Sequence, residues 1–103
     1  MIGILAALLI GGFSSSAWAV SGGLDRATPG ALVIDGQSYP VARDARSLPP
    51  GHSLYHRNLY NLSKQEIASL PRYDFRQYRA VLRVRTLMDG GRVQVIKPLE
   101  VAQ

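Results

Sequence analysis

A stretch of alternating residues near the C-terminus constrains the fold of this chain more than any other feature. Successive side chains of a strand point to opposite faces, and between residues 78 and 88 this rule separates a mostly apolar face from a mostly basic one. The apolar, core-facing side is predicted to carry Tyr78, Ala80, Leu82, Val84, Thr86 and Met88. Residues 89–92 (DGGR) then turn the chain, and residues 93–97 return antiparallel until Pro98, which cannot donate a ladder hydrogen bond. The pattern predicts a β-hairpin over about residues 78–97.

A second hairpin is predicted earlier in the chain, over about residues 31–41. Two short apolar runs flank Asp35-Gly36, a dipeptide that tolerates the positive φ angles of a type I′ turn. In this register Leu32 lies opposite Tyr39. The proline that follows the tyrosine cannot donate a ladder hydrogen bond, so it either places the second strand at an edge or ends its pairing there.

A short helix is predicted between the hairpins, over about residues 64–70. Ser63 and Glu66 have the spacing of a capping box, in which each side chain accepts a hydrogen bond from the other residue's backbone amide. Pro71 limits the helix, because a proline disfavours the helical conformation in the residue before it. The preceding residues 54–62 (LYHRNLYNL) fit a helical face and strict alternation almost equally well, so both interpretations stay open.

These elements together predict a small α+β domain, made of two antiparallel β-hairpins (about 31–41 and 78–97) with the short helix (about 64–70). One isolated hairpin is only marginally stable in water, so the two must share a sheet or pack through the helix, and a half-open barrel is the alternative arrangement. A length of 103 residues argues against several domains and leaves few side chains for a deep cofactor pocket.

The N-terminal segment predicts export. Residues 1–19 carry no charged side chain, and the apolar run 1–13 has about the length of the hydrophobic part of a signal peptide. Ala17 and Ala19 are small enough for the positions that signal peptidase reads, so we expect a signal peptide at 1–19 with cleavage after Ala19. The alternative is an uncleaved segment that anchors the protein in the inner membrane, although glycines and serines interrupt the apolar run.

The remainder of the chain divides into a leader and a domain. Residues 20–30 are rich in Gly, Ser, Thr and Pro without apolar periodicity, which predicts a flexible leader before an α+β domain at 31–103. The absence of cysteine excludes both a lipid-modified cysteine and a disulfide framework. A small exported domain without disulfides indicates a bacterial envelope, so we expect a periplasmic or secreted protein.

The residue types argue against catalysis. The chain has no cysteine nucleophile and no G-x-S-x-G motif, and none of its seven acidic residues pair up as a general acid and base. His52 and His56 have the spacing at which two imidazoles on a helix could hold one metal ion, but no third ligand lies nearby in the sequence. We therefore expect no enzyme activity and no cofactor, and binding of nickel, cobalt or copper through these histidines is the alternative.

The basic residues give the strongest indication of function. Between residues 72 and 85 the chain has five arginines against one aspartate, interleaved with aromatic side chains. Such a mixture suits nucleic acid in the cytosol, but an exported protein would meet acidic proteins, anionic polymers or lipid headgroups instead. A charged sheet face that discourages edge-to-edge aggregation is the alternative explanation. The predicted contact residues are Arg76, Tyr78, Arg79, Arg83 and Arg85.

The order of several short motifs supports this view. An LPPG turn at 48–51 is followed by LPRY at 70–73, then by Tyr78-Arg79, and then by the glycine-bounded valine strand GRVQVIKP at 91–98. This order resembles that of small exported bacterial proteins of the RcnB type and a related secreted domain family of unknown function, although an arginine-rich strand here replaces a more aromatic one. The resemblance implies a periplasmic accessory protein, in one branch linked to nickel and cobalt homeostasis.

We therefore expect a non-catalytic, exported binding or accessory protein. Its basic hairpin face would contact an acidic envelope protein, an anionic polymer or a lipid surface, and not nucleic acid. Contact with the membrane would otherwise occur only through an uncleaved N-terminal segment.

Overall fold

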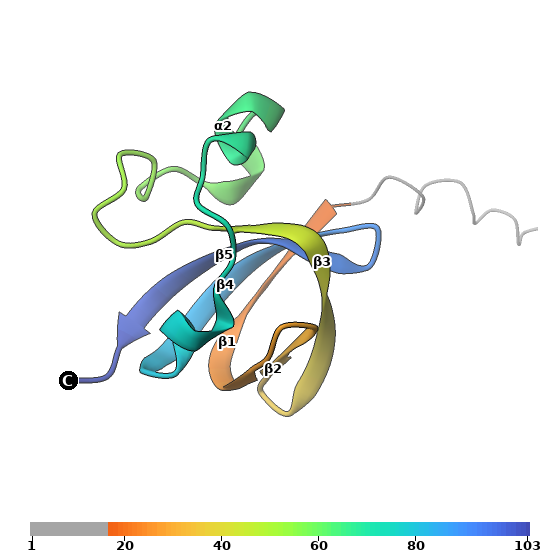
Figure 1. The fold of residues 1–103 in the computed structure, drawn as a ribbon, viewed down its shortest axis with the longest axis vertical. Coiled ribbons are helices and arrows are strands. Elements are labelled where there is room, and N and C mark those ends of the chain that lie inside the picture. The colour runs from red at the N-terminus through yellow and green to blue at the C-terminus, as the bar shows by residue number, and fades with distance from the viewer. Residues whose placement is uncertain (1–16) are drawn as a thin grey trace, which may run out of the picture.

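The computed structural model describes residues 17–103, which form a closed barrel of five strands (Figure 1). The strands are β1 (Ala17–Ala27), β2 (Ala31–Ile34), β3 (Gln37–Ser47), β4 (Val81–Asp89) and β5 (Arg92–Val101). They follow the order β1-β2-β3-β5-β4 around the barrel, and β4 closes on β1. Every neighbouring pair is antiparallel except β3 and β5, which are parallel. This order is that of the OB-type Greek-key barrel.

The predicted α+β domain is therefore wrong. Residues 20–27, which belong to the predicted flexible leader, lie in β1 and supply the strand that closes the barrel. The parallel pairing of β3 with β5 then joins the two hairpins into one structure. Most of the predicted signal peptide, residues 1–16, lies outside the described residues, so the signal peptide and its cleavage after Ala19 stay predictions.

β1 changes partner in its middle. Its first part, residues 17–23, pairs with β4, and its last residues pair with β2 across a bulge. Gly22 is buried at this point, where an added Cβ would lie 2.2 Å from Oδ2 of Asp35 and 2.9 Å from Cγ2 of Ile34. Asp35 also accepts from the Gly23 amide through Oδ1 (3.0 Å), and its own amide donates to the Gly23 carbonyl (2.9 Å). A glycine is needed here because the end of β2 approaches β1 too closely for a side chain.

The predicted hairpin of residues 31–41 is confirmed. Leu32 lies opposite Tyr39, and Asp35 and Gly36 have φ angles of 50° and 81°, as a type I′ turn requires. Pairing with β2 ends at Pro40, which lacks an amide hydrogen, and β3 then continues beside β5. The proline thus lies where β3 changes partner.

The C-terminal hairpin forms, but its alternation differs from the prediction. Bulges interrupt the pairing of β4 with β5 on both sides of Arg83: between Val81 and Arg83 the extra residue lies in β4 and shifts the side-chain alternation of that strand by one, whereas between Arg83 and Val84 the extra residue lies in β5. Val81 therefore packs in the core, whereas Leu82, predicted to be buried, is 48% exposed. β5 continues past Pro98 to Val101.

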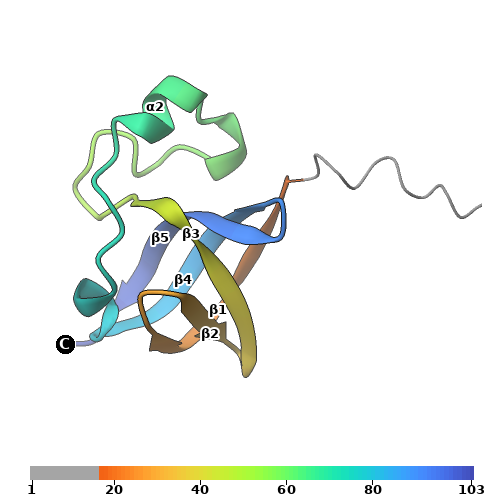
Figure 2. The same cartoon turned by 45° about the vertical axis from the view of Figure 1, so that its right-hand side comes forward.

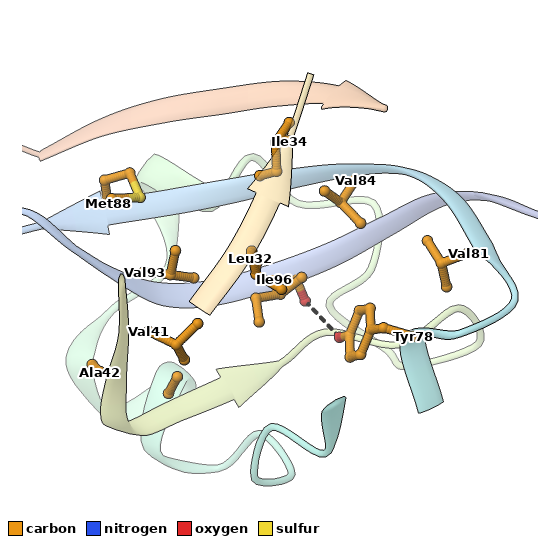
Figure 3. Packing of buried hydrophobic residues seen from close by; sticks show 11 residues of the cluster. Leu32, Ile34, Val41, Ala42, Tyr78, Val81, Val84, Met88, Val93 and Ile96 are labelled. Carbon is orange, nitrogen blue, oxygen red and sulfur yellow. Dashed lines mark hydrogen bonds between the residues drawn. The ribbon is translucent and has the colours of Figure 1, made fainter. Parts of the chain in front are cut away.

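Two hydrophobic cores lie on opposite sides of the barrel wall. The barrel core fills the interior and is shown in Figure 3. Its buried members are Leu32, Ile34, Val41, Ala42, Ala45, Tyr78, Val81, Val84, Met88, Val93 and Ile96. The second, which we call the connection core, lies between the outer wall and the chain that joins β3 to β4. It consists of Leu48, Leu59, Leu62, Leu70, Leu87 and Val95.

The β3–β4 connection, residues 48–80, stands on one side of the barrel in both ribbon views (Figures 1 and 2). It contains the 3-10 helix η1 (Leu59–Asn61), the short helix α2 (Lys64–Ala68) and the 3-10 helix η2 (Phe75–Tyr78). The predicted capping box of Ser63 and Glu66 is confirmed, but the helix ends earlier than expected. Residues 54–62 form turns and η1, so they are neither a long helix nor a strand. No helix within residues 17–103 is long and apolar enough to cross a membrane.

Candidate functional site

The outer face of β4 carries two of the predicted contact residues side by side. Arg83 and Arg85 occupy alternate positions of the strand, and both are exposed. Their neighbours on β1 are Gly23, which has no side chain, and Ser21, whose side chain is small, so the guanidinium groups stay uncovered. Nε of Arg85 donates to Oγ of Ser21 over 2.8 Å, which fixes the direction of this guanidinium. The first part of β1 thus supports the arginines without shielding them.

Lys97 on β5 extends this positive surface. It lies directly opposite Arg85, with its Nζ 4.8 Å from the centre of the Tyr55 ring. Burial lowers the pKa of Lys97 below its ordinary value, and the positive charge of Arg85 lowers it further. We call Arg83, Arg85 and Lys97 the basic face.

Lys97 was not among the contact residues predicted from the sequence, because a bulge changes the register between β4 and β5. A turn centred on Gly90 and Gly91 without irregularity would place Ile96 opposite Arg85. Instead, Met88 pairs with Val93 while the preceding residue pairs with Val95, which moves the register by one. The lysine is thereby brought next to the arginine, and no local sequence signal marks this shift.

No acidic side chain within residues 17–103 forms an ion pair with the basic face. Glu100 lies opposite Arg83 in the strand pairing, but the ion pairs within residues 17–103 are Arg57–Glu66 and Arg76–Asp74. The three cations of the basic face are therefore available to an external anion.

Arg79 lies apart from the basic face, in a hollow at the end of the barrel. This hollow has a volume of about 270 Å³, and Arg26 at the end of β1 lines it together with Arg79. Asp25 also lines it, with Oδ2 accepting from the Gly36 amide over 2.7 Å. Arg26 was missed because its segment was predicted to be a flexible leader.

Two predicted contact residues have other roles. Nε of Arg76 forms an ion pair with Oδ1 of Asp74 at 3.2 Å within the first turn of η2. Tyr78 is only 3% exposed and points into the barrel core, where its hydroxyl lies within hydrogen-bond distance of Oγ of Ser47 (3.0 Å) and of the Ile96 carbonyl (3.4 Å; Figure 3). Tyr78 thus lies in the core, as the alternation predicted, and its separate prediction as a contact residue is corrected because its side chain is buried.

The two histidines lie in the turns that follow the LPPG segment. Nδ1 of His52 accepts from the Leu54 amide over 3.1 Å, whereas His56 is exposed beside the edge of the Tyr55 ring. Within residues 17–103, no three histidine, aspartate or glutamate side chains gather as metal ligands.

Comparisons of the chain with protein-family models, curated proteins and solved structures give no match. The resemblance to RcnB-type proteins therefore stays a prediction.

Proposed function

We propose that this chain is a non-catalytic, exported binding protein whose basic face captures an anionic partner in the bacterial envelope. The partner supplies carboxylate or phosphate groups to Arg83, Arg85 and Lys97. Arginine suits this role because its planar guanidinium matches the geometry of carboxylate and phosphate oxygens.

The observation that carries the proposal is the juxtaposition of Arg85 and Lys97. Like charges directly opposite each other on neighbouring strands destabilise a sheet, and no acidic side chain of residues 17–103 forms an ion pair with either of them. A bound anion would remove this repulsion. The arrangement is therefore unfavourable for folding alone and favourable for binding.

The alternative explanation, protection against edge-to-edge aggregation, does not fit the topology. β4 pairs with β1 and β5, and β5 pairs with β4 and β3, so neither strand is an edge. A closed barrel leaves no row of unpaired backbone groups here for charges to protect. The OB-type fold itself assigns no ligand, so the proposal depends on the side chains.

A titration tests the proposal. The ¹⁵N-labelled chain would be titrated with poly-L-glutamate, polyphosphate and phosphatidylglycerol vesicles, each at low and high salt. We expect shifts at the basic face and salt-sensitive binding to at least one probe, and the probe that binds identifies the anion class. Absence of binding to all three probes, or shifts confined to other surfaces, would contradict the proposal.

A matched pair of variants separates the basic face from overall charge. Replacing Arg83 and Arg85 by Ser and Lys97 by Gln should weaken binding by about ten- to a hundredfold, since each exposed charge contact is worth roughly 0.5–1 kcal/mol. The control is the triple variant Arg43→Ser, Arg72→Ser and Lys64→Gln, which has the same net charge but leaves the basic face intact. Equal loss in both variants would mean that binding follows net charge alone.

Cleavage of the predicted signal peptide can be tested through Trp18, the only tryptophan of the chain. Cleavage after Ala19 removes this residue, so the mature product should show tyrosine but no tryptophan fluorescence. Its mass should correspond to a chain beginning at Val20. A product that retains Trp18 would support the uncleaved anchor instead.

A further inference from the structure

A second hollow lies between α2 and the barrel wall, lined by residues other than those of the basic face. Its volume is about 380 Å³, at the lower end of the range typical of small-molecule sites. Ile67 and Ala68 of α2 and Leu87 of β4 give it an apolar surface. It therefore offers space and apolar contact for a small ligand.

Charged side chains of both signs also line this hollow. Asp44 and Arg46 come from alternate positions of β3, Lys64 begins α2, and Asp89 ends β4. None of the four belongs to an ion pair within residues 17–103, although two acids and two bases share one hollow. Both signs of charge thus stay available to a ligand.

The positions of these charges are set by the fold. A strand rises about 3.3 Å per residue, so the alternate positions of Asp44 and Arg46 lie roughly 7 Å apart on one face of β3. One terminal nitrogen of Arg46 donates to the Leu70 carbonyl over 2.7 Å, which holds its guanidinium against the connection. Gln94, also at the hollow, donates to the backbone carbonyl of Asp89 over 3.1 Å and braces the end of β4. The hollow is thus bounded by anchored elements.

We propose that this hollow binds a small zwitterion, namely a free α-amino acid with an aliphatic side chain. Its ammonium group would pair with Asp44 and Asp89, and its carboxylate with Lys64 and Arg46. The aliphatic side chain would pack on Ile67 and its apolar neighbours. Such a ligand satisfies both signs of charge at once, which a simple anion or cation does not.

Four probes test the chemistry in the full chain by NMR titration. L-leucine should shift the amides that surround the hollow, whereas N-acetyl-L-leucine lacks the ammonium charge and L-leucinamide lacks the carboxylate. Each analogue should bind about tenfold more weakly or worse, since a lost hydrogen bond between charged groups is worth about that factor. Glycine, without the side chain, should also bind more weakly. If L-leucine causes no shifts at the hollow, or if N-acetyl-L-leucine and L-leucinamide bind as well as leucine, the proposal is overturned.

Variants assign the roles of the charged groups. Asp44→Asn should weaken the binding of leucine but add little to the loss already shown by N-acetyl-L-leucine, because both remove the same contact. Lys64→Gln should behave in the same way with L-leucinamide. The matched controls are Glu100→Gln and Lys97→Gln, which change an acid and a lysine outside the hollow and should leave leucine binding intact.

The two lysines also separate this proposal from the proposed function. Lys97→Gln should weaken polyanion binding alone, and Lys64→Gln should weaken leucine binding alone. Leucine binding that persists in Asp44→Asn and Lys64→Gln, or that is lost equally in the controls, would refute the zwitterion site whatever the outcome at the basic face.

Discussion

The barrel core and the connection core are both well buried, yet they are built differently. Strands β2 to β5 contribute buried residues to the barrel core, half-buried residues of β1 pack against it, and a closed hydrogen-bonded ladder holds its members. The connection core brings leucines of one segment onto two side chains of the outer wall, Leu87 and Val95. The first core therefore needs the whole barrel, whereas the second needs only that one segment lies on a barrel already formed. We infer that the connection can open locally while the barrel stays folded.

The largest effect is expected from the barrel core. Leu32 is fully buried, so Leu32→Ala should lower the free energy of unfolding by about 2–5 kcal/mol. Urea unfolding followed by circular dichroism measures this loss. Leu99→Ala on β5, where the side chain is partly exposed, is the control and should change stability by less than about 0.5 kcal/mol.

A smaller global effect is expected from the connection core. Leu59 is as deeply buried as the residues of the barrel core, but Leu59→Ala should act mainly on the connection. Hydrogen exchange should speed up within residues 48–78 while the amides of β2, β4 and β5 keep their protection. Equal loss of protection throughout the barrel would show that the two cores unfold as one unit and that the distinction between them is wrong.

Tyr78 joins the two regions, since it ends η2 but lies in the barrel core. Tyr78→Phe removes its hydrogen bonds and leaves the buried hydroxyl of Ser47 without this partner, at a cost of about 1–3 kcal/mol. Chemical denaturation at neutral pH measures the change. A cost near zero would mean that packing of the ring, and not its hydroxyl, holds η2 to the barrel.

The same residue predicts a pH dependence. Burial raises the pKa of Tyr78 to about 12, above its value in the unfolded chain of roughly 10. The folded state thus holds this proton more tightly, so the stabilisation is complete below pH ~10 and is lost as the pH rises towards 12. Tyr78→Phe should reduce this loss of stability at alkaline pH. The reduction should be only partial, because burial also raises the pKa of Tyr73, which keeps its own contribution. If stability falls with alkaline pH as steeply in Tyr78→Phe as in the unmutated chain, the contribution assigned to Tyr78 is contradicted.

Local signals predicted the parts of the fold that depend on neighbouring residues. The Asp35-Gly36 turn and the capping box of Ser63 and Glu66 each act within a few residues, and both form as expected. Closure of the barrel depends on pairs such as Val20 with Thr86, which are far apart in the sequence. β1 also lacks a regular apolar pattern, because it changes partner after Gly23 and carries small residues beside the arginines.

The candidate site was predictable to a similar degree. The exposed positions of Arg83 and Arg85 follow from simple alternation along β4. Tyr78 was wrong as a contact residue because its side chain is buried in the barrel core, and Lys97 was missed because a bulge moves the register of β5. Alternation thus identifies the outward side chains of one regular strand, but bulges decide which residues of its neighbour lie beside them.

The pKa of Lys97 tests the central claim most directly. It can be followed through the ¹³Cε resonance in the full chain, with and without the polyanion that binds. In the free protein we expect the pKa of Lys97 to lie below that of an ordinary lysine. Relative to this value, the pKa should rise when Arg85 is replaced by Ser, and it should also rise when the polyanion binds to the unmutated chain. A Lys97 pKa that does not respond to a saturating polyanion would show that the anion binds elsewhere and would contradict the proposed role of the basic face.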